Sequence, residues 1–171
     1  SVSSVGDLND DGRDDFIAGA PGDDAEGPEA GAAYVVYGGS DVGGSFDDDD
    51  TFAVKFTGED SQDEFGGNVV GDGDIDDDGA GDIMVSAPNS GGDSALGSVY
   101  IMYGPFDGSV SASDADVRFD GSTDDDKLGN SLAFVGDVDG DGNTAVLIGA
   151  AQKDTTGVDA GAAYLMLDIG L

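Results

Sequence analysis

The chain has 171 residues, of which 38 are acidic and five are basic, so its formal net charge at pH 7 is −33. So few Lys and Arg residues argue against nucleic acid or an anionic membrane surface as a partner, because neutralising phosphates requires basic side chains. With no Cys and no His, the chain has no disulfides, no Ser-His-Asp or Cys-His catalytic apparatus, and no thiolate or imidazole zinc site.

The apolar residues predict an all-β fold. They make up 38% of the chain and occur in short runs rich in Val, Ile, Tyr and Phe, separated by Gly, Asp and Ser. No window sustains a helical apolar period, so the runs indicate strands joined by turns. The first four strands are expected near residues 2–6, 15–20, 32–37 and 52–57.

An acidic loop, GDLNDDGRDD (6–15), lies between the first two of these strands. Side chains at alternate positions of a tight loop converge on one point, and a glycine at the sixth position permits the sharp turn. Carboxylate, amide and carbonyl oxygens suit Ca²⁺, which accepts six to eight oxygens with loose geometry. The predicted ligands are the side chains of Asp7, Asn9, Asp11 and Asp15 and the carbonyl of Arg13. An EF-hand is excluded because its twelfth position requires Glu, and Ala18 stands there.

The acidic loop recurs twice further along the chain, as GDIDDDGAGD (73–82) and GDVDGDGNTA (136–145). The ligands predicted for the second loop are the side chains of Asp74, Asp76, Asp78 and Asp82 and the carbonyl of Ala80. Those predicted for the third are the side chains of Asp137, Asp139 and Asp141 and the carbonyl of Asn143. Because Ala145 replaces the fourth carboxylate of the third loop, we expect two firm calcium sites and a weaker third.

The repetition extends to apolar and glycine positions, which an acidic composition cannot explain. The runs after the acidic loops are FIAGAP (16–21), IMVSAP (83–88) and VLIGAA (146–151). The runs after those are GAAYVVYG (31–38), GSVYIMYG (97–104) and GAAYLMLD (161–168). In addition, FTGEDSQDEFGGN (56–68) aligns with FDGSTDDDKLGNS (119–131). Four short strands per repeating unit are typical of a propeller blade.

We therefore predict a partial β-propeller of about three four-stranded blades with eleven strands, forming one segment over residues 1–171. The repeats are expected at about 1–64, 65–127 and 128–171, with the last blade incomplete. Phe65, Leu128 and the five tyrosines at repeat-equivalent places are expected to pack between blades. The acid runs at 46–50 and 122–127 lack the alternating spacing and are expected to be solvated loops.

At these residues the chain resembles FG-GAP repeats, which form the β-propeller of integrin α subunits. Phe65-Gly66 opens a unit, the acidic loop follows, and Gly19-Ala20-Pro21 ends the next strand. Ser86-Ala87-Pro88 and Gly149-Ala150-Ala151 are imperfect forms of the last motif, and Leu128 replaces the Phe. The heavy use of Asp with little Lys also resembles proteins of extreme, haloarchaeal-like halophiles.

The resemblance implies a non-catalytic calcium-binding module of a secreted or cell-surface protein that mediates adhesion or binds a protein or glycan. It implies that the partner binds on the face opposite the calcium loops, through segments such as 21–30 and 88–96. Because known propellers have about four to eight blades, we expect further blades of a longer chain, or a homo-oligomer, to complete the ring.

Two alternatives remain. The chain is an accessory domain or part of an extracellular carbohydrate-active hydrolase, or it is a structural filament or surface-layer subunit. A carboxylate pair supports glycoside hydrolysis, but no acid has a distinctive apolar context in the sequence that marks it as a proton donor.

Overall fold

The computed structural model describes residues 1–39, 42, 53–155, 157–167 and 169. Within them the fold is all-β, with twelve strands in three sheets and two short 3₁₀ turns, Gly92–Ser94 and Ala112–Asp114. The expected acidic loop at 46–50 lies outside the described residues, as does residue 52, where the fourth strand was expected to begin.

The first sheet contains the four strands expected at the start of the chain and one more. Its order is β1 (Val2–Gly6), β2 (Asp15–Ala20), β3 (Ala32–Val36), β4 (Val54–Thr57) and β8 (Gly108–Ser111). The first four strands pair antiparallel in sequence order, whereas β8 joins β4 in parallel.

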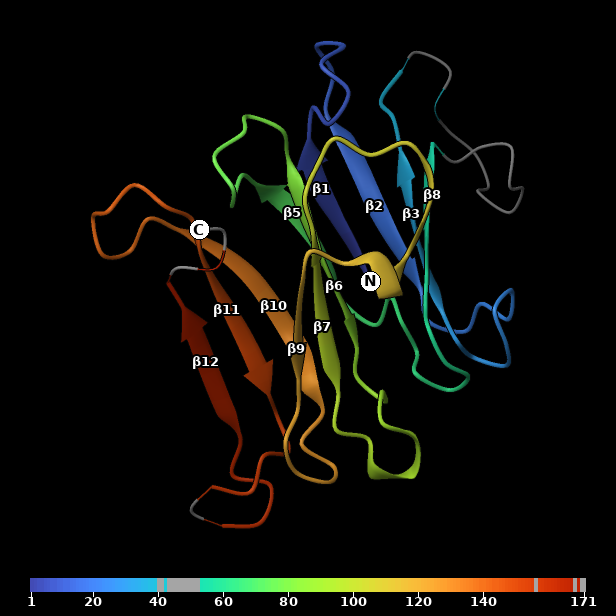
Figure 1. Ribbon diagram of the computed structural model, residues 1–171, viewed down its shortest axis with the longest axis vertical. Helices are drawn as coiled ribbons and strands as arrows, with labels where there is room; N and C mark the ends of the chain where they lie inside the picture. The colour runs from blue at the N-terminus through green and yellow to red at the C-terminus, as the bar shows by residue number, and fades with distance from the viewer. Residues whose placement is uncertain (40–41, 43–52, 156, 168, 170–171) are drawn as a thin grey trace.

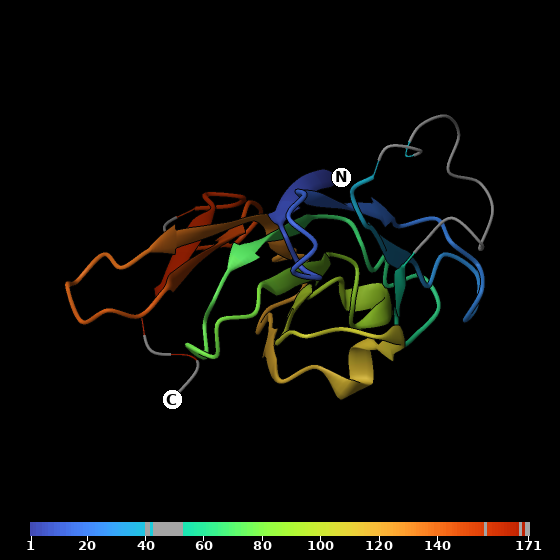
Figure 2. The ribbon, with the colours of Figure 1, turned by 90° about the horizontal axis from the view of Figure 1, so that it is seen from above.

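The other two sheets repeat this antiparallel arrangement. The second contains β5 (Val69–Gly73), β6 (Asp82–Ala87), β7 (Ser98–Met102) and β9 (Val117–Asp120). The third contains β10 (Leu128–Gly136), β11 (Ala145–Ala150) and β12 (Ala162–Met166). The three sheets lie side by side (Figures 1 and 2), so the predicted fold, a partial β-propeller whose last blade has three strands among the described residues, is confirmed.

The cores lie between the sheets. All residues of β6 and β7 are buried, because the second sheet is covered on both faces, whereas β12 alternates between half-buried and exposed positions. Phe65 and Tyr100 pack ring against ring between the first and second sheets, with centroids 5.5 Å apart. Leu128 lies in the core between the second and third sheets. The prediction that these three residues pack between blades is confirmed.

Strand β8 was missed, so the prediction of eleven strands was one short. Its sequence, Gly-Ser-Val-Ser, offers one apolar side chain and no alternating pattern that distinguishes a strand from a loop. Its partner β4 belongs to the preceding unit, so the pairing depends on tertiary packing. Nearby, Phe106 packs edge to face on Phe56 of β4, with centroids 5.2 Å apart.

The Phe-Gly and Gly-Ala-Pro motifs meet where the first two sheets join. A Cβ placed on Gly19 would lie 2.0 Å from the carbonyl oxygen of Gly66, and one placed on Gly66 would lie 2.2 Å from that of Ala32. The Gly66 N–H also donates to the carbonyl of Ser86, at 2.9 Å. Both glycines are therefore required by close backbone approach between blades.

Candidate metal centre

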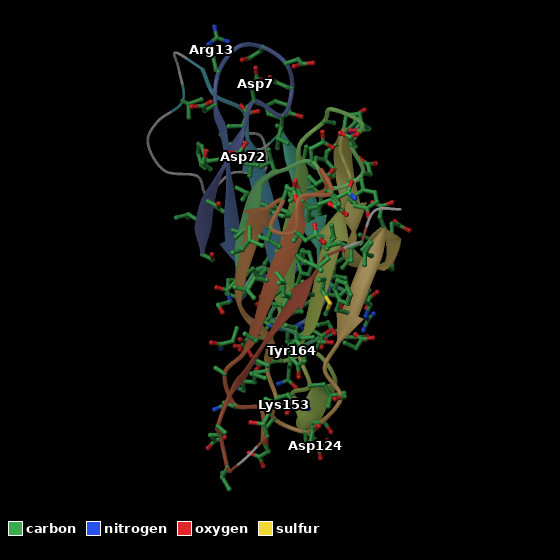
Figure 3. All side chains as sticks on the ribbon, turned by 90° about the vertical axis from the view of Figure 1, so that its left-hand side faces the viewer. Asp7, Arg13, Asp72, Asp124, Lys153 and Tyr164 are labelled. Carbon is green, nitrogen blue, oxygen red and sulfur yellow. The ribbon has the colours of Figure 1, made fainter. Side chains whose placement is uncertain are left out.

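The three acidic loops occupy corresponding places, each joining the first and second strands of its sheet. They lie at the same end of the sheets in Figure 1, and Asp7 and Arg13 mark that end in Figure 3. Each loop is enclosed by a strand pair, in which Gly6 faces Asp15, Gly73 faces Asp82 and Gly136 faces Ala145. The antiparallel hairpins therefore bring all three candidate sites to one rim.

The first carboxylate of each loop organises the turn from inside. In the first loop Asp7 accepts hydrogen bonds from the backbone N–H of Asp11 at 3.0 Å and of Gly12 at 2.8 Å. The Asp11 N–H also donates to Asn9 Oδ1 at 3.1 Å. Because Asp7 Oδ1 and Asn9 Oδ1 share this donor, two predicted ligand atoms lie close together.

The same bonds recur in the other two loops. Asp74 accepts from the N–H groups of Asp78 and Gly79 at 3.2 and 3.1 Å. Asp137 accepts from those of Asp141 and Gly142 at 3.2 and 3.0 Å. Left-handed backbone makes this turn possible, and it occurs at the fourth and sixth loop positions in every copy. The residues are Asp10, Gly12, Asp77, Gly79, Gly140 and Gly142, with φ between 59° and 101°.

Carboxylate oxygens converge in the second and third loops. Oxygens of Asp74, Asp76 and Asp78 lie within 4.8 Å of one another, and so do those of Asp137, Asp139 and Asp141. Each set offers three carboxylates to one point, and each carboxylate oxygen has more than one lone pair to offer. Such a set of hard oxygen donors fits Ca²⁺ better than it fits metals that favour nitrogen or sulfur ligands.

The three residues whose carbonyls are predicted ligands donate their backbone N–H groups to the fifth-position carboxylate of the same loop. The N–H of Arg13 donates to Asp11 at 3.0 Å. Those of Ala80 and Asn143 donate to Asp78 at 2.7 Å and to Asp141 at 2.9 Å. These bonds hold the N–H side of each residue next to the fifth-position carboxylate, and ligation by the residue's own carbonyl stays a prediction.

The ninth-position carboxylates are buried. Each forms a clamp, by which we mean that it accepts hydrogen bonds both from its own loop and from the glycine that follows the third strand of the sheet. Asp15 accepts hydrogen bonds from the N–H groups of Leu8 at 2.8 Å and Gly38 at 2.7 Å. Asp82 accepts from those of Ile75 at 2.6 Å and Gly104 at 3.0 Å. Both oxygens of each side chain are therefore used, and Asp82 is not among the converging oxygens of its loop. Ligation by Asp15 and Asp82 stays a prediction.

Burial determines the ionisation of Asp82, which is fully inaccessible to solvent. Desolvation raises its pKa to about 6, and the charges of Asp76 and Asp74 add to this, while the bonds from Ile75 and Gly104 act in the opposite direction. A divalent cation beside these carboxylates would favour the ionised form.

Sequence reasoning missed the partners of this clamp, although the sequence carries a signal for them. Gly38 and Gly104 end the repeated runs GAAYVVYG and GSVYIMYG. In the third unit the clamp carboxylate is replaced by Ala145, which is buried, and the sequence has Asp168 where the glycine stood. The sequence of the third unit therefore lacks both the clamp acid and the glycine of the first two units.

Two further buried aspartates lie at the opposite end of the sheets from the metal loops. Asp63 is 4% exposed, and burial together with the charges of Asp60 and Glu59 raises its pKa to about 6. Asp126 is 2% exposed and accepts a hydrogen bond and ion pair from Lys153 at 2.5 Å. The expectation that 122–127 is a solvated loop therefore holds for the exposed residues 122–125 and was wrong for Asp126.

A signal for these two residues was present in the sequence. Asp63 and Asp126 align with each other when 56–68 is set against 119–131. Each side chain is held at the same kind of turn, since the Thr123 N–H donates to Asp126 at 3.1 Å and the Asp60 backbone donates to Asp63. Because the chain has so many other acidic residues, this repeat-equivalent pair could not be distinguished from exposed acids in the sequence.

Comparison with known proteins agrees with the geometry of these loops and motifs. Residues 1–36, which contain β1, the first acidic loop and β2, match the FG-GAP repeat family. The chain is 33% identical over 164 residues to integrin alpha-5 of Xenopus laevis. Both findings support an FG-GAP, integrin α-like family. The similarity covers 91% of this chain and 15% of that protein, so the chain spans a small part of the relative it matches. Among the described residues, no helix is long and apolar enough to cross a membrane.

Proposed function

We propose that the chain is a non-catalytic, calcium-stabilised propeller module of a secreted or cell-surface protein, and that it binds a protein or glycan ligand in adhesion. The observation that carries the proposal is the repeated convergence of loop oxygens at equivalent places of three sheets. The similarity to an integrin α subunit supports the adhesive role.

Calcium is proposed to bind most firmly in loops 7–15 and 74–82 and more weakly in 137–145. In the first two loops the buried carboxylates of Asp15 and Asp82 already bind the backbone that follows the third strand of the sheet, at Gly38 and Gly104. The third loop has Ala145 at that position and so has one carboxylate less and no equivalent clamp. Bound Ca²⁺ would rigidify the hairpin and offset the mutual repulsion of its carboxylates.

The partner is proposed to bind at the opposite rim, through segments such as 21–30 and 88–96. Figure 1 shows these connections at the lower end of the sheets, away from the acidic loops. Segments 21–30 and 88–96 differ in composition while the strands that carry them repeat. A rigid scaffold that presents variable loops is a common arrangement for binding.

A high-salt working environment, as in halophiles, is part of this proposal. With 38 acidic and five basic residues, the chain requires screening by salt or neutralisation by bound cations in order to stay compact. Further blades, supplied by a longer polypeptide or by a second copy, are proposed to complete the propeller.

Calcium titration calorimetry on chelator-treated protein in concentrated KCl tests the metal sites. The expected result is two sites with dissociation constants on the order of 0.1–1 mM, as in extracellular calcium modules, and a weaker third. Asp74→Asn with Asp78→Asn should abolish one of the two stronger sites. The matched pair Asp137→Asn with Asp141→Asn should remove only the weakest. A titration without binding, or three equal sites, would contradict the proposal.

A further inference from the structure

The fourth strands of the first two sheets carry similar short sequences, AVKFTG (53–58) in β4 and DVRFDG (116–121) in β9. Each pairs antiparallel with the third strand of its sheet in the same register. Lys55 lies opposite Tyr34, and Arg118 lies opposite Tyr100. Directly paired residues project on the same face of a sheet, so a basic side chain meets a tyrosine ring in both sheets.

The two pairs have the same geometry. Lys55 Nζ lies 5.2 Å from the centroid of the Tyr34 ring, and Arg118 Cζ lies 5.2 Å from that of Tyr100. These distances are within the range of a cation–π interaction. The cation of the second sheet also reaches the preceding blade, because Arg118 pairs with Glu59 at 2.5 Å.

The third sheet has the equivalent tyrosine but, among the described residues, no fourth strand. Tyr164 in β12 pairs with Ile148 of β11 as Tyr100 pairs with Val85 of β6. Among the described residues, β12 pairs with β11 alone, and no cation lies over the Tyr164 ring. A strand edge with unpaired backbone groups is a template for another strand.

A cavity of about 270 Å³ lies between the second and third sheets, on the side to which Tyr164 projects. Phe119, Ile148 and Met166 supply apolar surface, and Asp126 supplies a carboxylate. The ion-paired side chains of Arg118 and Asp120 also line it. An apolar passage that leads to a tyrosine ring and an acid suits the alkyl stem and charged head of a basic side chain.

Asp126 has an unsatisfied bonding capacity in this cavity. Its side chain is 3% exposed, and Oδ2 is bound by Lys153 and by the Thr123 N–H. Oδ1 is buried and has no hydrogen-bond partner in the part of the chain that the structure describes, and an unpaired buried carboxylate oxygen is costly. The repeat-equivalent Asp63 is already influenced by a cation, because the charge of Arg118 acts to lower its pKa.

We propose that this cavity binds the Lys or Arg side chain of an added strand of the type Val-(Lys/Arg)-Phe, which pairs with the free edge of β12 and places the basic residue opposite Tyr164. The basic head stacks on the Tyr164 ring and donates to Asp126 Oδ1, while Lys153 keeps Oδ2. The following Phe lies opposite Ala163, as Phe56 lies opposite Ala33 and Phe119 opposite Val99. The inference rests on the proposed completion of the propeller and specifies the chemistry of the strand that completes it.

The test uses the full chain, extended after residue 171 by a flexible linker of about ten residues and the sequence AVKFTG. A second version carries AVMFTG, in which Met preserves the apolar length of the side chain and removes the charge. Hydrogen exchange of the β12 amides is measured in concentrated KCl with calcium. Both strands should slow this exchange, and the Lys version should slow it about threefold to thirtyfold more than the Met version.

Three variants locate the effect. Tyr164→Leu and Asp126→Asn should each reduce the difference between the Lys and Met versions. Tyr34→Leu removes the equivalent ring in the first sheet, where Lys55 already lies over it, and should leave the difference unchanged. Equal protection by the two strands would overturn the assignment of a basic side chain and leave propeller completion intact. Protection by neither strand would overturn the inference while the calcium sites remain separately testable.

Discussion

At the residue scale, burial divides the aspartates into two groups that composition cannot distinguish. Asp7, Asp74 and Asp137 begin exposed or half-buried loops and fold them by accepting backbone N–H groups. Their place in a tight turn was predictable, because the alternate spacing and the glycine are local signals, whereas their bonds to the backbone were not predicted. Asp63 and Asp126 are buried by contacts with other parts of the fold, which the sequence reveals only through the alignment of two repeats.

The raised pKa of Asp63 leads to a prediction for stability against pH. An acid whose pKa is about 6 in the folded state and near 3.8 when unfolded binds more protons when folded between these values. Stability should therefore fall as pH rises from about 4 to about 6. Asp63→Asn should weaken this fall when unfolding is followed by denaturant titration across that range. Asp114→Asn, at an exposed position, serves as the control and should leave the slope unchanged; an unaltered slope for Asp63→Asn would refute the assignment.

At the scale of elements, strands that repeat were predictable and the strand that does not repeat was missed. Short apolar runs predicted the first four strands close to where they lie and a total of eleven, whereas β8 becomes a strand only because β4 offers it an edge. The Phe-Gly and Gly-Ala-Pro motifs could be recognised in the sequence, but their purpose could not. The structure shows that Gly19 and Gly66 allow backbones of adjacent blades to touch.

Substitution of Gly66 tests this junction. Gly66 has φ +89°, and an added Cβ would meet the Ala32 carbonyl oxygen at 2.2 Å, so Gly66→Ala combines backbone strain with a clash. We expect it to lower the free energy of unfolding by about 3 kcal/mol. Gly79→Ala is the matched control, because Gly79 has φ +88° and nothing within 4 Å of the added Cβ. It should cost only about 1 kcal/mol when measured without calcium. If both variants lowered the free energy of unfolding equally, the close contact between blades at Gly66 would not contribute to stability.

At the scale of the whole molecule, the charge of −33 opposes the compact arrangement of the three sheets. Few ion pairs offset this negative charge among the described residues. Four of the five basic side chains, all but Lys127, lie within 4.0 Å of at least one acidic side chain. Most carboxylates therefore depend on water, backbone donors or cations from solution. The acidic loops concentrate this repulsion at one rim, which is where calcium is proposed to bind.

The fold should therefore loosen in dilute buffer without divalent ions. Lowering the ionic strength from 1 M to 0.01 M lengthens the reach of charge repulsion from about 3 Å to about 30 Å, so the melting temperature should fall steeply over this range. If the metal loops bind calcium specifically, a few millimolar CaCl₂ should restore stability further than KCl of equal ionic strength, because bound ions neutralise carboxylates at the contact distances where screening is weakest. The Asp74→Asn, Asp78→Asn double variant should lose part of this excess. A melting temperature independent of both salts would mean that the sheets hold together without help from cations, whereas equal effects of the two salts would assign the stabilisation to screening alone.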